Sequence, residues 1–338
     1  MVNKIALLQR CIGTHVGVHV GDTKGAPFET MGAEMIAAIQ HERGNSALFD
    51  YANPWAKDGN GAILPAGRPT DDSEQTACLA ASLIACNGLD TAHLYKLLRA
   101  SVFDQKSLLW NGRSTGAGGT TKNALSGDPE RMALARQNTI GTNGSLMRTA
   151  PMGLWWATRI LDITDQAARA EQVKEAKAMV FAMSDVTHAH IDSKDACWLY
   201  TIVLANLLAG NEPWVALHDV EYVDPPIVES ALCQRIYRDL RTDIAPVDPG
   251  AWPARGTAEF SLYVALYALK HATSFTDGID ISIRVGGDTD TYAAIAGGLL
   301  GAHYGYEAIP LEWRKTILGH DQMVDYATKI YELRCGAH

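Results

Sequence analysis

Two short segments of this 338-residue chain are unusually rich in side-chain oxygen. The first runs from Gly286 to Thr291 and reads GGDTDT, and the second, far upstream, runs from Thr70 to Ser73 and reads TDDS. Each stands directly before a run of small and apolar residues that is typical of a buried helix. Short carboxylate and hydroxyl side chains on tight turns are the ligands that hard divalent cations prefer. The pair of segments therefore indicates a metal site.

A simpler interpretation is that these aspartates cap their helices, because a carboxylate there accepts hydrogen bonds from unpaired backbone N–H groups. The pairs Asp71–Glu74 and Asp72–Gln75 even resemble a capping box. A cap needs one acceptor, however, and residues 70–73 and 288–291 each offer several. Four aspartates from two segments can hold two ions about 3.5–4 Å apart, as in two-metal hydrolytic sites. We therefore interpret both clusters as ligands.

A third segment, from Gly21 to Glu29, also places glycines around an aspartate, Asp22. Taken alone it predicts a turn followed by a solvated glutamate. Beside the other two clusters, Glu29 becomes a candidate carboxylate for acid–base chemistry.

Helical patterns dominate the elements that would have to position these residues. Few stretches alternate apolar and polar residues, so no sheet is predicted. A segment rich in glycine, serine and threonine at 105–127 reads as a long loop, and 211–256, with six of the thirteen prolines, reads as an excursion with a short helix near 229–240. We predict one all-helical domain over 1–338, with helices at 72–85, 166–183, 195–209, 257–272 and 290–303.

The composition limits the classes of function. Hydrophobic residues make up 47% and charged residues 20%, which indicates a globular core, and the net charge of −9 without a basic stripe argues against nucleic-acid binding. No apolar stretch has the roughly 18–20 residues of a membrane span, and no signal peptide is apparent. The six cysteines lack C-x-x-C spacing and read as reduced thiols. We expect a cytoplasmic monomer that does not associate with membranes.

Together the three acidic segments resemble the ADP-ribosylglycohydrolase family, which includes the dinitrogenase-reductase-activating glycohydrolases and the ADP-ribosylarginine and ADP-ribosylserine hydrolases. The family pattern G-D-x-x-G-x-x-x-E matches 21–29, and T-D-D-T matches 70–73 with Ser73 in the last place. The pattern GGDTDT followed by AAIAG matches 286–291 and 293–297. Weaker similarity lies at 143–148 (NGSLMR) and 187–190 (THAH). The resemblance spans residues 13 to about 305.

The resemblance implies an orthogonally packed, all-α domain with two Mg²⁺ or Mn²⁺ ions at the base of a cleft. It implies candidate catalytic carboxylates at Glu29, Asp71 and Asp288. The metal ligands that it implies are Thr70, Asp71, Asp72, Asp288, Asp290 and Thr291. The substrate-binding residues that it implies are the glycine-rich loop Gly116, Ala117, Gly118 and Gly119, which would contact a diphosphate, together with Asn143, Gly144 and His188.

The activity that the resemblance implies is hydrolysis of the bond between C1″ of ADP-ribose and an acceptor, through an oxocarbenium-like transition state. Arginine on a protein is the first expectation for the acceptor. Serine-linked ADP-ribose, O-acetyl-ADP-ribose, ADP-ribosylated nucleic acid and a non-catalytic protein that binds ADP-ribose or blocks a toxin remain alternatives. Two departures from the family, Thr142 in place of a glycine and the absence of tyrosine from the glycine-rich loop, concern the choice of substrate.

Overall fold

The computed structural model describes residues 4–43, 65–114, 116–161, 165–218, 230–231, 234, 236 and 256–335. Every named element in these ranges is an α-helix or a short 3₁₀-helix, and β-pairing is limited to three isolated bridges. The predicted all-α class is therefore confirmed. None of the helices in these ranges has the length and apolar character needed to span a bilayer.

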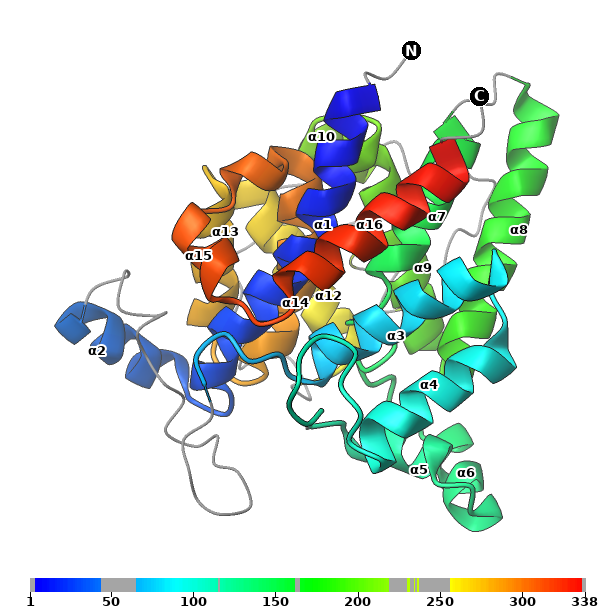
Figure 1. Cartoon of the computed structure of the whole chain (residues 1–338), viewed down its shortest axis with the longest axis horizontal. Coiled ribbons are helices and arrows are strands. Elements are labelled where there is room, and N and C mark those ends of the chain that lie inside the picture. Colours follow the sequence, from blue (N-terminus) through cyan, green and yellow to red (C-terminus); the bar gives the residue numbers. More distant parts are fainter. Residues whose placement is uncertain are drawn as a thin grey trace.

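The elements follow one another along the chain as a succession of mostly short helices (Figure 1). In order they are α1 (Lys4–Gly25), η1 (Ala26–Phe28), α2 (Ala33–Arg43), α3 (Asp71–Cys86), α4 (Thr91–Phe103), α5 (Gly119–Leu125), α6 (Pro129–Arg136), α7 (Ala150–Leu161), α8 (Gln166–Asp185), α9 (Ile191–Leu208), α10 (Pro213–His218), α12 (Ala258–His271), α13 (Phe275–Arg284), α14 (Thr289–Tyr304), η5 (Tyr306–Ala308), α15 (Leu311–Thr316) and α16 (His320–Cys335).

At the centre of the molecule α1 packs antiparallel against α14, and this is the most extensive contact between any two described helices. Glycines recur every fourth residue along α1, at 13, 17, 21 and 25, and they face Gly301, Gly297, Ala293 and Thr289 of α14 in turn. A Cβ built at Gly21 would lie 1.9 Å from the carbonyl oxygen of Ala293, so no larger residue fits between the two backbones. The glycines therefore allow the helices to touch, which brings the last turn of α1 beside the first turn of α14.

The remaining helices surround this pair. In Figure 1, α16 lies alongside α1, and α3 leads from the centre towards α4, α5 and α6, whereas α2 projects from the edge of the assembly. The core between them contains several large side chains that are almost fully buried, among them Trp156, Trp198 and Phe260.

Comparison with the predicted elements shows two differences. The five predicted helices are present with ends shifted by up to four residues, but the predicted loop at 105–127 contains α5. Gly21 and Asp22 lie in the last turns of α1 rather than in a turn, because the glycine repeat extends that helix to Gly25. The predicted helix near 229–240 lies almost entirely outside the described residues. Cys86 is exposed, whereas Cys11, Cys78 and Cys197 are buried free thiols.

Candidate metal centre and substrate cleft

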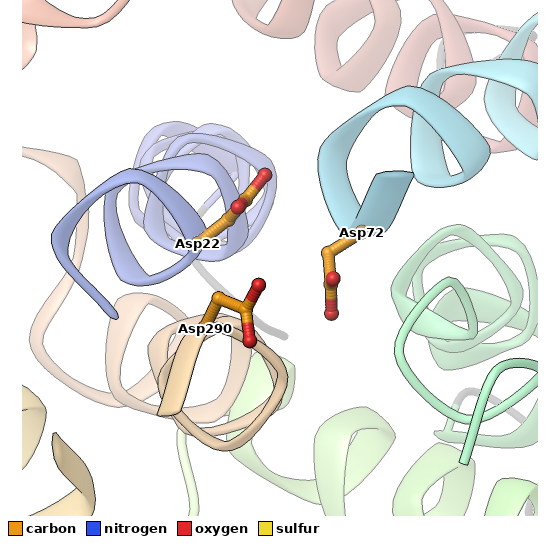
Figure 2. A group of neighbouring side chains, drawn as sticks. All are labelled: Asp22, Asp72 and Asp290. Atoms are coloured by element: carbon orange, nitrogen blue, oxygen red, sulfur yellow. The ribbon is translucent and has the colours of Figure 1, made fainter. Parts of the chain in front are cut away.

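Three aspartates from three helices converge at one point (Figure 2). Asp22 of α1, Asp72 of α3 and Asp290 of α14 each offer one carboxylate oxygen within 4.8 Å of the other two, and all three side chains are buried. A second group, within the same limit, consists of Glu29, Asp288 and Asp290. Because Asp290 belongs to both groups, the two acidic sets are contiguous.

The start of α3 is tightly hydrogen-bonded. Thr70 is its N-cap residue, and its hydroxyl accepts a hydrogen bond from the backbone N–H of Asp72. The Thr70 hydroxyl and N–H donate to the two oxygens of Asp22 at 2.7 and 3.0 Å, and the N–H and hydroxyl of Ser73 donate to Asp22 as well. Asp22 thus holds the first turn of α3 in place. Because Thr70 caps the helix, the carboxylates of Asp71 and Asp72 are not needed as capping groups and stay available as ligands.

Asp72 is a buried carboxylate with few partners. Its Oδ2 lies 3.2 Å from the Thr70 hydroxyl, which donates its one hydrogen over the shorter distance to Asp22, and a side-chain hydrogen bond from Thr291 also reaches the carboxylate. Its Oδ1 is buried without a hydrogen-bond partner by distance and angle among the described residues. Burial first, and then the charges of Asp22, Asp71 and Asp288, raise the pKa of Asp72 well above its ordinary value. A buried, unpartnered carboxylate oxygen among other carboxylates is costly unless a cation neutralises it.

The start of α14 is held differently. Asp288 occupies the N-cap position but makes no capping hydrogen bond. Instead its Oδ2 accepts from the Asn143 amide at 2.7 Å, and the hydroxyl of Thr289 donates to the carbonyl oxygen of Gly25 across the helix pair. Burial, and then Asp72 and Asp288, raise the pKa of Asp290 well above its ordinary value.

Asp71 connects the metal cluster to the glycine-rich loop. Its Oδ2 accepts from the Gln75 amide at 3.0 Å, and a backbone hydrogen bond from Ala117 also reaches its carboxylate. Gly116, at φ 104°, lies so close that a Cβ there would meet Asp71 Oδ1 at 2.2 Å. Burial, together with the charges of Asp22 and Asp288, raises the pKa of Asp71 to about 6, although the bond from Ala117 acts in the opposite direction. A glycine at 116 is therefore required for the loop to lie against the acidic cluster.

Glu29 is exposed at the rim of the cleft. The residues that follow Glu29 are bonded to the turn before α14. The N–H of Thr30 donates to the carbonyl oxygen of Gly287 at 2.6 Å, and the N–H of Gly287 donates to the carbonyl oxygen of Met31 at 2.8 Å. These bonds join the first acidic segment to the last. Partial loss of water, followed by the charges of Asp288 and Asp22, raises the pKa of Glu29.

A cleft of about 780 Å³ opens above the acidic cluster. Its walls include every residue that the sequence analysis assigned to catalysis, metal binding or substrate binding: Glu29, Thr70, Asp71, Asp72, Gly116, Ala117, Gly118, Gly119, Asn143, Gly144, His188, Asp288, Asp290 and Thr291. The structure thus brings together positions separated by more than 250 residues of sequence. Asn143, expected to contact substrate, also donates to Ser261 and Asp288, so its amide orients a carboxylate.

Two charged residues of the site were not assigned from the sequence. Asp22 was part of the first acidic segment, but nothing in that segment showed that its carboxylate accepts hydrogen bonds from Thr70 and Ser73. Arg68 lies on the cleft wall two residues before Thr70, and no local pattern distinguishes it from a surface arginine.

The donor set fits divalent cations. It offers at least four carboxylates with short side chains, one with a buried unpartnered oxygen, in a setting that opposes their ionisation. Two contiguous triads sharing Asp290 are suited to one ion or to a pair. Without a counter-charge these groups would repel one another, so the arrangement can bind cations and, through them, an oxygen-rich ligand.

Comparisons with known proteins agree with this geometry. A model of the family described as ADP-ribosylglycohydrolase matches residues 3–338. The chain is 25% identical over 329 residues to ADP-ribosylarginine hydrolase Tri1 of Serratia proteamaculans, covering 96% of this chain and 79% of that protein. It is also 25% identical over 368 residues to ADP-ribosylhydrolase ARH3 of Danio rerio, covering 99% and 93% of the two chains.

A solved structure described as an ADP-ribosylglycohydrolase-related protein complex has the same fold, with a TM-score of 0.67 and 24% identity over 97% of this chain and 99% of that one. The family match covers nearly the whole sequence, and the named relatives are ADP-ribosyl hydrolases. This chain belongs to the ADP-ribosylglycohydrolase family and is a hydrolase of the glycosidase type.

Proposed function

We propose that this protein is a Mg²⁺-dependent hydrolase that removes ADP-ribose from arginine side chains of proteins by cleaving the N-glycosidic bond. The observation that carries the proposal is the convergence of Asp72, Asp290 and Asp288 at the base of a cleft whose volume suits a ligand of this size. The preference for arginine is supported by the Serratia proteamaculans and Pseudomonas putida relatives, which are named ADP-ribosylarginine hydrolases.

The residues that would hold two Mg²⁺ ions, or Mn²⁺ in their place, are Thr70, Asp71, Asp72, Asp288, Asp290 and Thr291. Bound ions of this kind supply Lewis acidity and lower the pKa of water. In this assignment Asp22 acts behind the ligands, because its oxygens are occupied by Thr70 and Ser73.

Three carboxylates, Glu29, Asp71 and Asp288, are candidates for moving a proton. Asp71 is engaged by Gln75 and Ala117, and Asp288 is engaged by Asn143. Glu29 is exposed to the cleft rim and has a raised pKa, so it can exchange protons with water most readily. We therefore assign the general acid–base role to Glu29. The loop from Gly116 to Gly119, Gly144 and His188 also line the cleft, and we assign the binding of the diphosphate to them.

The deciding experiment is to incubate the protein with ADP-ribosylarginine, with Mg²⁺ or with EDTA, and to measure the release of free ADP-ribose. We expect release that requires Mg²⁺ and is lost in Asp290→Asn. Glu29→Gln should still bind Mg²⁺ but turn over slowly. Release by EDTA-treated protein, or full activity of Asp290→Asn, would contradict the metal assignment.

Parallel reactions with a serine-linked ADP-ribosyl peptide, ADP-ribosylated nucleic acid and O-acetyl-ADP-ribose identify the acceptor. The Danio rerio relative is named an ADP-ribosylhydrolase with no acceptor specified, so these conjugates stay the alternative substrates. Tight binding of ADP-ribose without turnover of any conjugate would instead indicate a non-catalytic binding or toxin-blocking protein. We further propose that the protein acts as a cytoplasmic monomer with a single domain.

A further inference from the structure

Behind the wall of the cleft lies a guanidinium group that no role described so far explains. Arg148 is fully buried, and its NH1 donates to the side-chain oxygen of Gln75 at 2.9 Å and to the carbonyl oxygen of Gly144 at 3.1 Å. Its NH2 donates to the Thr187 hydroxyl at 2.6 Å. No carboxylate in the described part of the chain pairs with it, and burial lowers its pKa to about 10. A buried cation held by neutral acceptors is costly, so a compensating role is expected.

The bond from Arg148 determines what the Thr187 hydroxyl can do. A guanidinium can only donate, so the hydroxyl oxygen is the acceptor in that bond. The other side-chain contact of Thr187 is His188 Nδ1 at 2.7 Å. If Nδ1 carried the proton, the buried hydroxyl would have no acceptor for its own hydrogen among the described residues. Since an unsatisfied buried donor is unfavourable, the hydroxyl donates to Nδ1, and the imidazole proton of His188 lies on Nε2.

That Nε2–H is placed at the cleft. His188 is one of the lining residues, and a Cβ built at Gly144 would lie 3.0 Å from His188 Nε2 and 3.1 Å from the Thr121 hydroxyl. Burial first, and then the Arg148 charge, lower the pKa of His188 to about 3. The ring is therefore neutral and acts as a donor rather than as a proton-transfer group.

The same guanidinium also links His188 to the acidic cluster. Gln75 accepts from Arg148 through its oxygen and donates through its nitrogen to Asp71 Oδ2. A continuous chain of hydrogen bonds thus runs from Asp71 through Gln75, Arg148 and Thr187 to His188. Its unbalanced positive charge lies behind the wall that carries His188, in a low-dielectric interior where charges act strongly on a nearby anion.

We propose that Arg148 is a positioning residue that holds His188 in the neutral tautomer with its proton on Nε2, so that His188 donates a hydrogen bond to a phosphate oxygen of the bound ligand. The identity of that ligand as an ADP-ribose conjugate rests on the function proposed above. The tautomer itself follows from the contacts of Arg148 and Thr187 alone.

The first test is a ¹⁵N NMR spectrum of the histidine side chains of the wild-type protein at neutral pH, with His188→Gln used to assign the His188 signals. We expect a protonated, pyrrole-type Nε2 and an unprotonated, pyridine-type Nδ1. The reverse pattern, a protonated Nδ1 and an unprotonated Nε2, would overturn the proposal. This measurement needs no substitution that could disturb the contacts of Arg148. Thr187→Ser should keep the wild-type pattern, whereas Thr187→Val, which is nearly isosteric, should lose it. Thr201→Val removes a buried hydroxyl that bonds only within α9 and serves as the control.

The second test measures binding of ADP-ribose by calorimetry in buffer with Mg²⁺. Loss of a fixed donor should raise Kd about tenfold in Thr187→Val, with Thr187→Ser and Thr201→Val unchanged. An altered tautomer with unchanged Kd would overturn the proposed contact with phosphate. If the wild-type protein does not bind ADP-ribose at all, the proposed function fails, and the NMR result still decides whether His188 has the tautomer that the contacts of Arg148 and Thr187 require.

Discussion

The starts of α3 and α14 are chemically similar, yet the protein holds them in opposite ways. At α3, Thr70 caps the helix, and Asp22 receives four hydrogen bonds from Thr70 and Ser73. At α14, Asp288 makes no capping bond, and the turn is held by the contact of the helix with α1 and by Asn143. One start is fixed by polar contacts and the other mainly by packing between backbones.

This difference explains why the aspartates at the two helix starts are not used as ordinary N-caps. In α3 a threonine takes the capping role, and Asp72 Oδ1 has no hydrogen-bond partner in the part of the chain that the structure describes. In α14 the cap is omitted, and Gly286 and Gly287, both at positive φ, bring Asp288 round into the cleft. In both cases the carboxylates stay available because something else stabilises the turn. The two starts should therefore respond differently to substitution.

The largest effect is expected from disturbing the packing that holds α14. In Gly21→Val the new side chain would meet the Ala293 backbone, so α1 and α14 must separate, and we expect a loss of about 3 kcal/mol or more in the free energy of unfolding. Urea denaturation measures it. Gly32→Ala is the control, because a Cβ there has no atom within 4 Å, and it should change stability by about 0.5 kcal/mol at most. A wild-type midpoint for Gly21→Val would contradict the close packing.

A second prediction concerns the acidic cluster that both starts share. The pKa of Asp71 is raised to about 6, and those of Asp72 and Asp290 are raised well above their ordinary value. These carboxyl groups hold protons in the metal-free folded state that they lose in the unfolded state, so the stability they contribute should be lost as the pH rises through their folded pKa values, which we test between pH 6.5 and pH 8. The buried histidines act in the opposite direction, because they are neutral when folded while the unfolded imidazoles are still partly protonated at pH 6.5. Their contribution is the same with and without Mg²⁺, so the carboxylates are read from the difference between EDTA and Mg²⁺ at each pH.

Mg²⁺ should reverse this trend, because ions replace protons as the counter-charge and bind only the ionised carboxylates. Melting temperatures in EDTA and in millimolar Mg²⁺ at both pH values test it. We expect the increase in Tm caused by Mg²⁺ to be several degrees and to be larger at pH 8. A Tm that is unchanged between EDTA and Mg²⁺ would exclude a metal site in this cluster.

A smaller effect is expected from removing the polar support of the α14 start. Asn143→Ala deletes the donor to Asp288 Oδ2. Because this is a hydrogen bond to a charged group, we expect its removal to lower kcat/KM about tenfold. The control is Asn206→Ala. The Asn206 amide donates to the Ile202 carbonyl within α9 and accepts from Asn211, so its removal should leave activity unchanged. Equal activity in the two variants would show that Asp288 does not depend on Asn143.

The smallest effect is expected at the α3 start, where the hydrogen bonds are redundant. Ser73→Ala removes one of four donors to Asp22, and we expect a loss of about 1 kcal/mol in stability with activity retained at saturating Mg²⁺. Ser73→Thr keeps the hydroxyl and should match the wild type. Loss of activity in Ser73→Ala without loss of stability would mean that Ser73 has a direct role in the site.

Much of the candidate site could be located from the sequence, because its parts are local. Each acidic cluster consists of a few consecutive residues, a threonine and two aspartates at 70–72 and two glycines followed by DTDT at 286–291, so it can be recognised without knowing the fold. The helices that follow them were predictable for the same reason. The glycines at 13, 17, 21 and 25 were equally visible, but a four-residue repeat does not name the helix against which it packs.

The sequence by itself determined which side chains can bind cations and that they stand at the beginnings of helices, since both properties depend on a few neighbouring residues. Only the tertiary structure decided which oxygen remains without a partner and which is occupied, as at Asp72 and Asp22. It also decided the proton position that we infer for His188, which depends on Arg148. The physical reason is that a hydrogen bond needs its partner within about 3 Å, and these partners come from distant parts of the chain.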